Sequence, residues 1–216
     1  MADDYASKDD PTVPAALQRM ATFYFAATNY TAAEPVLQRL ATLQAKSLGE
    51  TNDATLTTQT ALAAVYVHEG KETPAELLYQ KIIALNEKAS GPNSRDTAVA
   101  VANLAKLYLN TGQYEKAEPL YRRLLAQAEK YQGGGLALTP ILADEVVLYS
   151  KLNRDEDLIA VYRRQISVYE QMFGSNSVAL VKPLSDCATL LAKGKRGDEA
   201  AAMETRASAI KAAHPK

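Results

Sequence analysis

The stretch that decides the fold of this chain is Asn103-Leu-Ala-Lys-Leu-Tyr-Leu-Asn-Thr-Gly-Gln-Tyr-Glu-Lys-Ala-Glu-Pro-Leu-Tyr-Arg-Arg-Leu-Leu125. Apolar or small residues at positions 104, 105, 107 and 108, and again at 117, 120, 121, 124 and 125, recur with the period of an α-helix. Gly112 lies between the two runs, where a tight turn can use a left-handed residue. The stretch therefore predicts two helices joined by a turn.

The chain repeats this hairpin at a nearly constant step. Tyr24, Tyr66 and Tyr108 are 42 residues apart, and Tyr149 follows 41 residues later. Two alanine series keep the same step, at positions 21, 63 and 105 and at positions 33, 75 and 117. A period of this length is typical of arrays in which each helical pair buries its apolar face against its neighbours. We expect five such pairs in all.

Local signals locate the ends of the pairs. Glycine recurs at positions 49, 91, 133 and 174, where it can supply the left-handed conformation just past a helix. The single missing residue of the register falls between Gly133 and Pro140, so we expect a flexible joint there. The sequence Thr31-Ala-Ala-Glu34 has the pattern of a capping box, with Thr31 as the N-cap of a second helix.

Composition excludes several classes of function. The 216 residues are 47% hydrophobic and carry a net charge of −1, so no basic field suits nucleic acid or an anionic lipid surface. No apolar run reaches the roughly 20 residues of a membrane span. We expect a soluble protein, cytoplasmic by default, with a periplasmic or secreted location left open if a leader precedes Met1 in the full protein.

The opening stretch resembles the tetratricopeptide repeat, in the long variety of kinesin light chains. The resemblance is carried by Asn103-Leu-Ala-x-Leu-Tyr108, Gly112-Gln-Tyr114 and Ala117-Glu-Pro-Leu-Tyr-Arg-Arg123. Nothing in the chain shows the heptad coiled coil of a kinesin light chain, so we do not expect it to be one. The resemblance implies an all-α, right-handed superhelical solenoid of about five helix-turn-helix repeats. Their approximate ranges are 13–52, 53–94, 95–136, 137–176 and 177–213, between a lead-in at 1–12 and a tail at 214–216.

The resemblance also implies that the first helix of each repeat lines a concave groove that holds an extended peptide or a partner helix. One stripe of each first helix faces away from its expected core, and we expect this stripe to lie in the groove. The alternative is that these are ordinary solvated positions, and that Phe25 packs between neighbouring helices. The candidate groove residues are Arg19, Thr22, Phe25, His68, Asn103, Lys106, Asn110 and Lys151.

The first predicted helix is apolar around most of its circumference from Ala15 to Ala27, which indicates burial on more than one side. We expect either self-association through this helix or an upstream segment that covers it.

The residues offer little for catalysis. His68-Glu69 lacks the second histidine of a zinc protease helix, and Cys187 falls on a core-facing position, where a buried and inert thiol is the expected state. We therefore predict a non-enzymatic scaffold that binds another protein or an extended peptide, with no cofactor and no metal. The alternative is a regulatory receptor in which a small signalling peptide changes the curvature of the array at Gly133–Gly135.

Overall fold

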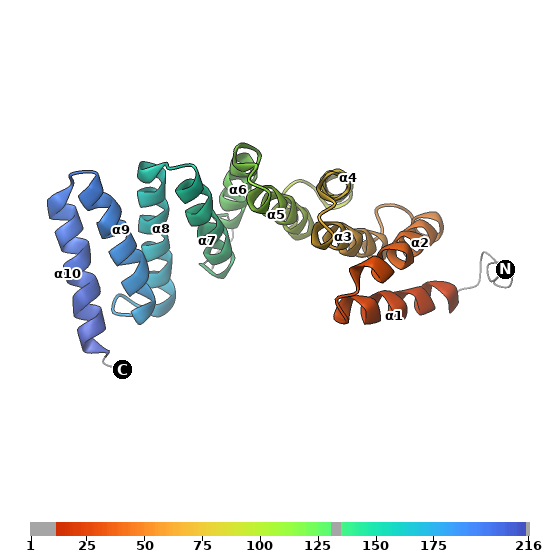
Figure 1. Cartoon of the computed structure of the whole chain (residues 1–216), viewed down its shortest axis with the longest axis horizontal. Coiled ribbons are helices and arrows are strands. Elements are labelled where there is room, and N and C mark those ends of the chain that lie inside the picture. Colours follow the sequence, from red (N-terminus) through yellow and green to blue (C-terminus); the bar gives the residue numbers. More distant parts are fainter. Residues whose placement is uncertain (1–11, 131–134, 215–216) are drawn as a thin grey trace. The chain divides into compact units, whose positions relative to one another are not determined.

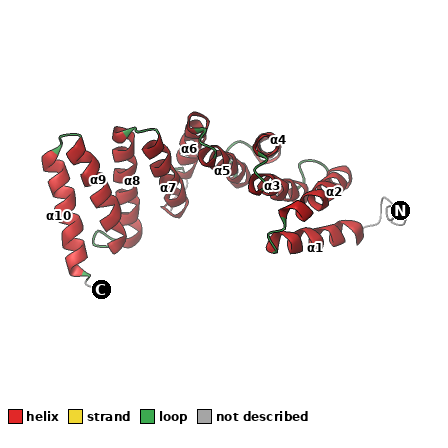
Figure 2. Ribbon diagram, in the orientation of Figure 1, coloured by secondary structure: helices red, strands yellow, loops and turns green. Residues whose placement is uncertain are grey.

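A computed structural model describes residues 12–130 and 135–214 of the chain (Figure 1). Within these ranges the secondary structure is helical throughout, and Figure 2 shows the helices joined by short loops. The elements are α1 (Thr12–Ala26), α2 (Tyr30–Leu48), α3 (Asp53–His68), α4 (Glu72–Ser90), α5 (Arg95–Asn110), α6 (Tyr114–Ala128), α7 (Gly135–Lys151), α8 (Asp155–Phe173), the 3-10 helix η1 (Val178–Leu180), α9 (Val181–Lys193) and α10 (Gly197–Ala213).

The chain divides into two compact units, residues 1–107 and 108–216. In the first unit α1 packs on α2, α2 on α3 and α3 on α4. In the second unit α6, α7, α8, α9 and α10 pack in the same consecutive order. The chain is thus an all-α array of helical hairpins, as the repeat predicts.

The turn inside each hairpin has one geometry in all five repeats. A residue with positive φ ends the first helix at the same register position: Thr28, Gly70, Gly112, Asn153 and Lys195. The next residue donates its backbone N–H to a carbonyl five positions earlier, for example Gln113 N to Tyr108 O at 2.8 Å. This bond is the closing bond of a Schellman motif. The positive φ at this position explains why glycine, as Gly112, suits the third turn.

The loops between hairpins are also repeated. Gly49, Gly91 and Gly174 adopt φ values of 98°, 89° and 85° just past α2, α4 and α8, as predicted, while Gly133 lies outside the described residues. The buried hydroxyls of Thr55 and Thr97 donate to the carbonyls of Gly49 and Gly91, both at 2.9 Å. Each bond ties the next first helix to the loop before it.

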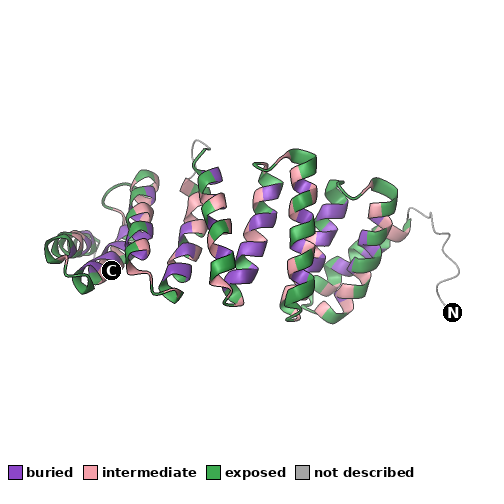
Figure 3. Ribbon diagram, turned by 90° about the horizontal axis from the view of Figure 1, so that it is seen from above, coloured by how far each residue is buried: buried purple, intermediate pink, exposed green. Residues whose placement is uncertain are grey.

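The core lies between the helices, where Figure 3 shows the buried residues facing their neighbours. Both alanine series are buried, and Ala33, Ala75 and Ala117 are fully so, which lets the two helices of a hairpin approach closely. In the second unit the core gathers around residues of α7, α8 and α9, and the thiol of Cys187 is buried there as expected. Burial raises the pKa of that thiol.

Polar contacts fix the register between consecutive repeats of the second unit. The Tyr121 hydroxyl of α6 donates to Asp144 Oδ2 of α7 at 3.0 Å, and Tyr162 of α8 donates to Asp186 Oδ2 of α9 at 3.2 Å. Asp144 and Asp186 occupy the register position of Asn103. In the fourth and fifth repeats, the residue at this first position of the predicted groove stripe is therefore half-buried and has a structural role.

Two local predictions are wrong. The N-cap of α2 is Asn29 and not Thr31: the Asn29 side chain accepts a hydrogen bond from Ala32 N at 3.2 Å. Asn29 is the N-cap because α2 begins at Tyr30, two residues closer to the turn than a helix capped by Thr31 would begin. Residues Gly135–Pro140 form the start of α7 and not a joint. Pro140 lies inside α7, beyond its first turn. The remaining part of the expected joint, 131–134, lies outside the described residues.

A search for membrane spans among residues 12–130 and 135–214 finds no helix long and apolar enough to cross a bilayer.

Candidate functional site

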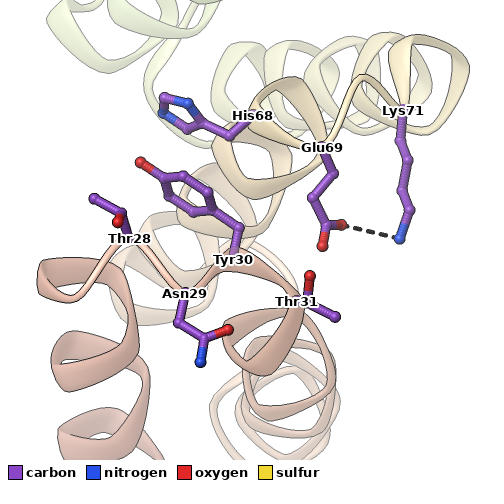
Figure 4. A pocket seen from close by; sticks show the side chains of 7 residues that line it. All are labelled: Thr28, Asn29, Tyr30, Thr31, His68, Glu69 and Lys71. Carbon is purple, nitrogen blue, oxygen red and sulfur yellow. Dashed lines mark ion pairs between the residues drawn. The ribbon is translucent and has the colours of Figure 1, made fainter.

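The first unit holds an open pocket of about 550 Å³ where the turn between α1 and α2 meets the end of α3 (Figure 4). Two consecutive turns of the repeat build it, so its lining comes from two hairpins. The lining residues are Thr28, Asn29, Tyr30, Thr31, His68, Glu69 and Lys71.

Aromatic rings form one wall of the pocket. The Tyr30 phenol and the His68 imidazole are stacked in parallel, with centroids 4.2 Å apart. Phe25, 37% exposed, meets both rings edge-on, at 5.6 Å from Tyr30 and 6.4 Å from His68. We call Phe25, Tyr30 and His68 the aromatic shelf.

The repeat architecture does not require the aromatic shelf. The register position of His68 holds Ala26, Asn110, Lys151 and Lys193 in the other repeats, and that of Tyr30 holds Glu72, Tyr114, Asp155 and Gly197. These residues share neither size nor charge, so packing of the array sets no common demand there. The aromatic shelf is thus specific to the first two repeats.

Glu69 and Lys71 form the other wall, and Glu34 pairs with Lys71 just outside the lining. Lys71 Nζ lies 2.5 Å from Glu34 Oε2 and 2.9 Å from Glu69 Oε2, and we call these three residues the Lys71 triad. The hydrogen bond from Lys71 is the main cause of the lowered pKa of Glu69, whose side chain is only 12% exposed. In return, the bonds to Glu34 and Glu69 raise the pKa of Lys71. By formal charge, two carboxylates and one ammonium leave the Lys71 triad with one negative charge in excess.

Thr28 at the rim of the pocket is strained. Its φ is 54°, a conformation that a β-branched residue rarely adopts and that glycine takes in the next two repeats. Strain of this kind concentrates at functional sites. A threonine kept here places a methyl and a hydroxyl group at the pocket, where glycine would leave a bare backbone.

The structure places the predicted groove residues as follows. Phe25 and His68 are brought together in the aromatic shelf. Arg19 and Thr22 are exposed on α1, and the Thr22 hydroxyl donates to the Gln18 carbonyl at 2.9 Å. On α5, Asn103 is half-buried and Lys106 and Asn110 are exposed, while Lys151 is exposed in the last turn of α7. These positions stay predictions as binding residues.

Sequence reasoning missed Tyr30, Glu34, Glu69 and Lys71. A signal for the charged wall was present, because Glu118 and Arg154 occupy the register positions of Glu34 and Lys71 and pair at 2.8 Å in the second unit. The stack of Tyr30 on His68 has no such signal, since it occurs once.

The part of the chain that the structure describes contains no group of three or more acidic, histidine or cysteine side chains that could hold a metal ion. The pocket walls instead combine flat apolar rings with paired charges, an arrangement that suits binding of a flat or charged side chain.

Three solved structures show how the fold compares with known proteins. A putative kinesin light chain of Podosopora anserina with nearly identical TPR-like repeats aligns at a TM-score of 0.70 and 17% identity, over 94% of this chain and 97% of its own. BtubC (BKLC) from P. vanneervenii gives 0.70 at 19% identity, over 96% and 86%. A double mutant of MamA from RS-1 gives 0.61 at 12%, over 93% and 96%.

At the level of sequence, no curated protein matches the chain. The tetratricopeptide repeat family matches residues 12–88 and 75–130, which together cover more than half of it. The chain belongs to the tetratricopeptide repeat family, and its fold is similar to that of kinesin-light-chain-like repeat proteins.

Proposed function

We propose that the chain is a non-enzymatic scaffold that binds an extended peptide segment of a partner protein, with the aromatic shelf as part of the binding surface. One observation carries this: the exposed rings of Phe25 and His68 gather around the half-buried Tyr30 in a cluster that the register positions of the other repeats do not share. Exposed aromatic groups at a pocket are typical of binding sites for other proteins.

The other groove residues belong to the same proposal. Within the first unit, Arg19, Thr22, Asn103 and Lys106 lie on first helices and are proposed as further binding residues. Asn110 and Lys151 are proposed in the same role within the second unit. Asparagine side chains suit this role because each can donate to and accept from the backbone of an extended peptide.

The test is a selection of peptides from a random display library on the intact chain, followed by affinity measurements on the selected peptides. We expect Tyr30→Ala and His68→Ala to weaken binding at least about 10-fold. Ser208→Ala, at an exposed position of α10 and so on a second helix, is the control. Equal binding by the wild type and both shelf variants would move the site away from the aromatic shelf.

The second candidate, a receptor whose ligand is a small signalling peptide that acts at Gly133–Gly135, remains a prediction. Residues 131–134 lie outside the described ranges. A thermal-shift screen with short peptides discriminates it from the scaffold, because a ligand that binds only the folded state raises its stability.

We also propose self-association through α1. Met20 and Phe23 are 43% and 69% exposed, whereas Leu62 and Val65, at the same positions of α3, are 7% and 0% exposed because α3 packs on α2. These two positions are thus the ones at which a first helix packs on a preceding helix. Arg19 is the single charged residue of α1 that would oppose pairing with a second copy of the chain.

Sedimentation velocity over a wide concentration range tests this. We expect a dimer that Phe23→Asp disrupts and that Phe173→Asp, an equally apolar exposed site on α8, leaves intact. A monomer at all concentrations would rule out self-association through α1.

A further inference from the structure

We propose that the pocket beside the aromatic shelf receives an arginine side chain of the bound peptide. This inference rests on the proposed function and specifies its ligand chemistry. Its basis is the meeting of two walls in one pocket: the rings of Tyr30 and His68 on one side and the ion pair of Glu69 and Lys71 on the other (Figure 4).

The formal charge around the pocket favours a cation. Glu69 and Lys71 of the lining carry opposite charges and pair at 2.9 Å, and Glu34, just outside the lining, pairs with the same Lys71 at 2.5 Å, so the Lys71 triad as a whole keeps one negative charge in excess. The remaining lining groups, apart from His68, are neutral: two threonines, an asparagine and a tyrosine. An acidic ligand would meet an ammonium that is already paired with two carboxylates, whereas a basic ligand meets the excess negative charge.

Low exposure strengthens this preference. The side chains of Glu69 and Glu34 are 12% and 20% exposed, so solvent screens them less than it would two fully exposed acids. Both carboxylates are also held in position. Glu34 accepts from Gln38 Nε2 at 2.9 Å, and Gln38 Nε2 in turn lies 3.0 Å from the Tyr66 hydroxyl. A bound cation therefore meets acids that are already ordered.

The rings select arginine among the cations. A guanidinium group is flat and weakly hydrated and stacks on aromatic faces, whereas the lysine ammonium is a compact and strongly hydrated charge. In the parallel stack of Tyr30 and His68, with planes 1° apart, each ring covers one face of the other, so a flat group can stack on an outer face of the pair. An arginine can contact these rings and keep its N–H donors for the carboxylates and the threonine hydroxyls.

The test uses the intact chain and small probes, so that its result does not depend on finding a peptide. N-acetylarginine methylamide is titrated while the ring resonances of His68 and Tyr30 are followed by NMR. The comparison probes are the corresponding derivatives of lysine, glutamate and citrulline, the last of which is the neutral isostere of arginine. We expect saturable shifts with the arginine probe and at least about 10-fold weaker binding of citrulline and glutamate.

Variants separate the two walls. Glu69→Gln should weaken the arginine probe at least about 5-fold and leave the ring resonances otherwise intact, and Glu34→Gln is a second variant should that one fail to fold. His68→Ala should reduce the preference for arginine over lysine. Glu156→Gln on α8, an exposed acid that lies 3.3 Å from Arg196, is the matched control and should change nothing.

Equal affinity for citrulline or glutamate, or no saturable shift with the arginine probe up to on the order of 50 mM, would overturn the inference. The proposed function fails separately, when the display selection yields no peptide whose binding depends on the aromatic shelf. A selected peptide that binds the shelf but tolerates replacement of every arginine by glutamine overturns the inference alone.

Discussion

The imidazole of His68 lies flat on the phenol ring of Tyr30, with centroids 4.2 Å apart and planes 1° apart. Tyr30 is the first residue of α2 and His68 the last of α3, so the stack joins two consecutive repeats at the surface. Phe25 adds an edge-on contact to both rings. The aromatic shelf therefore links neighbouring hairpins as well as lining a pocket.

This stack predicts an energetic coupling between the two residues. Aromatic pairs contribute about 0.5–1.5 kcal/mol beyond the area they bury. Tyr30→Ala, His68→Ala and the double variant form a cycle, measured by urea unfolding followed by circular dichroism. We expect the double variant to lose less stability than the sum of the single losses, by about 0.5–1 kcal/mol. Additive losses would mean that the rings touch without stabilising each other.

Thr28 predicts an unusual gain. Because a left-handed conformation costs a non-glycine residue about 1–2 kcal/mol, Thr28→Gly should raise the free energy of unfolding by about 0.5–1 kcal/mol. The matched control is Thr22→Gly in the interior of α1, where the same change should lower stability by a few tenths of a kcal/mol. If Thr28 shapes the pocket, the same Thr28→Gly variant should bind selected peptides less tightly. If Thr28→Gly and Thr22→Gly both lowered the free energy of unfolding, the backbone at Thr28 would not be strained.

Much of the fold could be predicted from the sequence because each repeat restates the same physical constraints. Ala33 and Ala117 had to be small at a close crossing, and Gly112 had to take a left-handed turn. The pocket could not be predicted in this way. Its stack depends on the angle between two hairpins, which brings together Tyr30 and His68 from positions that the register does not relate.

Tyr121 shows the same limit within the array. Position 121 belongs to the helical pattern of apolar residues in the opening stretch, and Tyr121 is buried as expected. That its hydroxyl also donates to Asp144 could not be predicted, because the period identifies which residues face the next repeat but not which polar atoms meet there.

That hydrogen bond predicts a specific cost. Tyr121→Phe removes a bond to a half-buried carboxylate, and bonds to charged groups contribute about 1.5–3 kcal/mol. We expect a loss of about 1–2 kcal/mol in urea unfolding. Tyr114→Phe, half-buried at the start of the same helix, is the matched control and should cost less. If Tyr121→Phe matched the wild type, the Tyr121–Asp144 bond would not help to fix the register of these repeats.

Glu145 predicts a dependence of stability on pH. It lies on α7 at the register position of Leu62, Leu104 and Cys187, and is 3% exposed. Burial, with a smaller contribution from the nearby Glu118 carboxylate, raises its pKa from 4.5 to about 7, and the nearby Arg122 guanidinium only partly offsets this. An acid with a raised pKa holds its proton more firmly in the folded state than in the unfolded state. Its effect is therefore to lower stability as the pH rises from about 4.5 to about 7, with no further loss above.

At about 1.4 kcal/mol for each pKa unit, the loss attributable to Glu145 is on the order of 3–4 kcal/mol. Glu145→Gln removes this titration, so the variant should be more stable than the wild type at pH 8 and close to it at pH 5. Denaturant unfolding at a series of pH values measures both. Glu115→Gln, an exposed acid on α6, controls for the loss of one charge and should leave the pH dependence unchanged. The stability of the wild type and that of Glu145→Gln could instead rise by the same amount between pH 5 and pH 7. That result would show that ionisation of the buried carboxylate costs no stability.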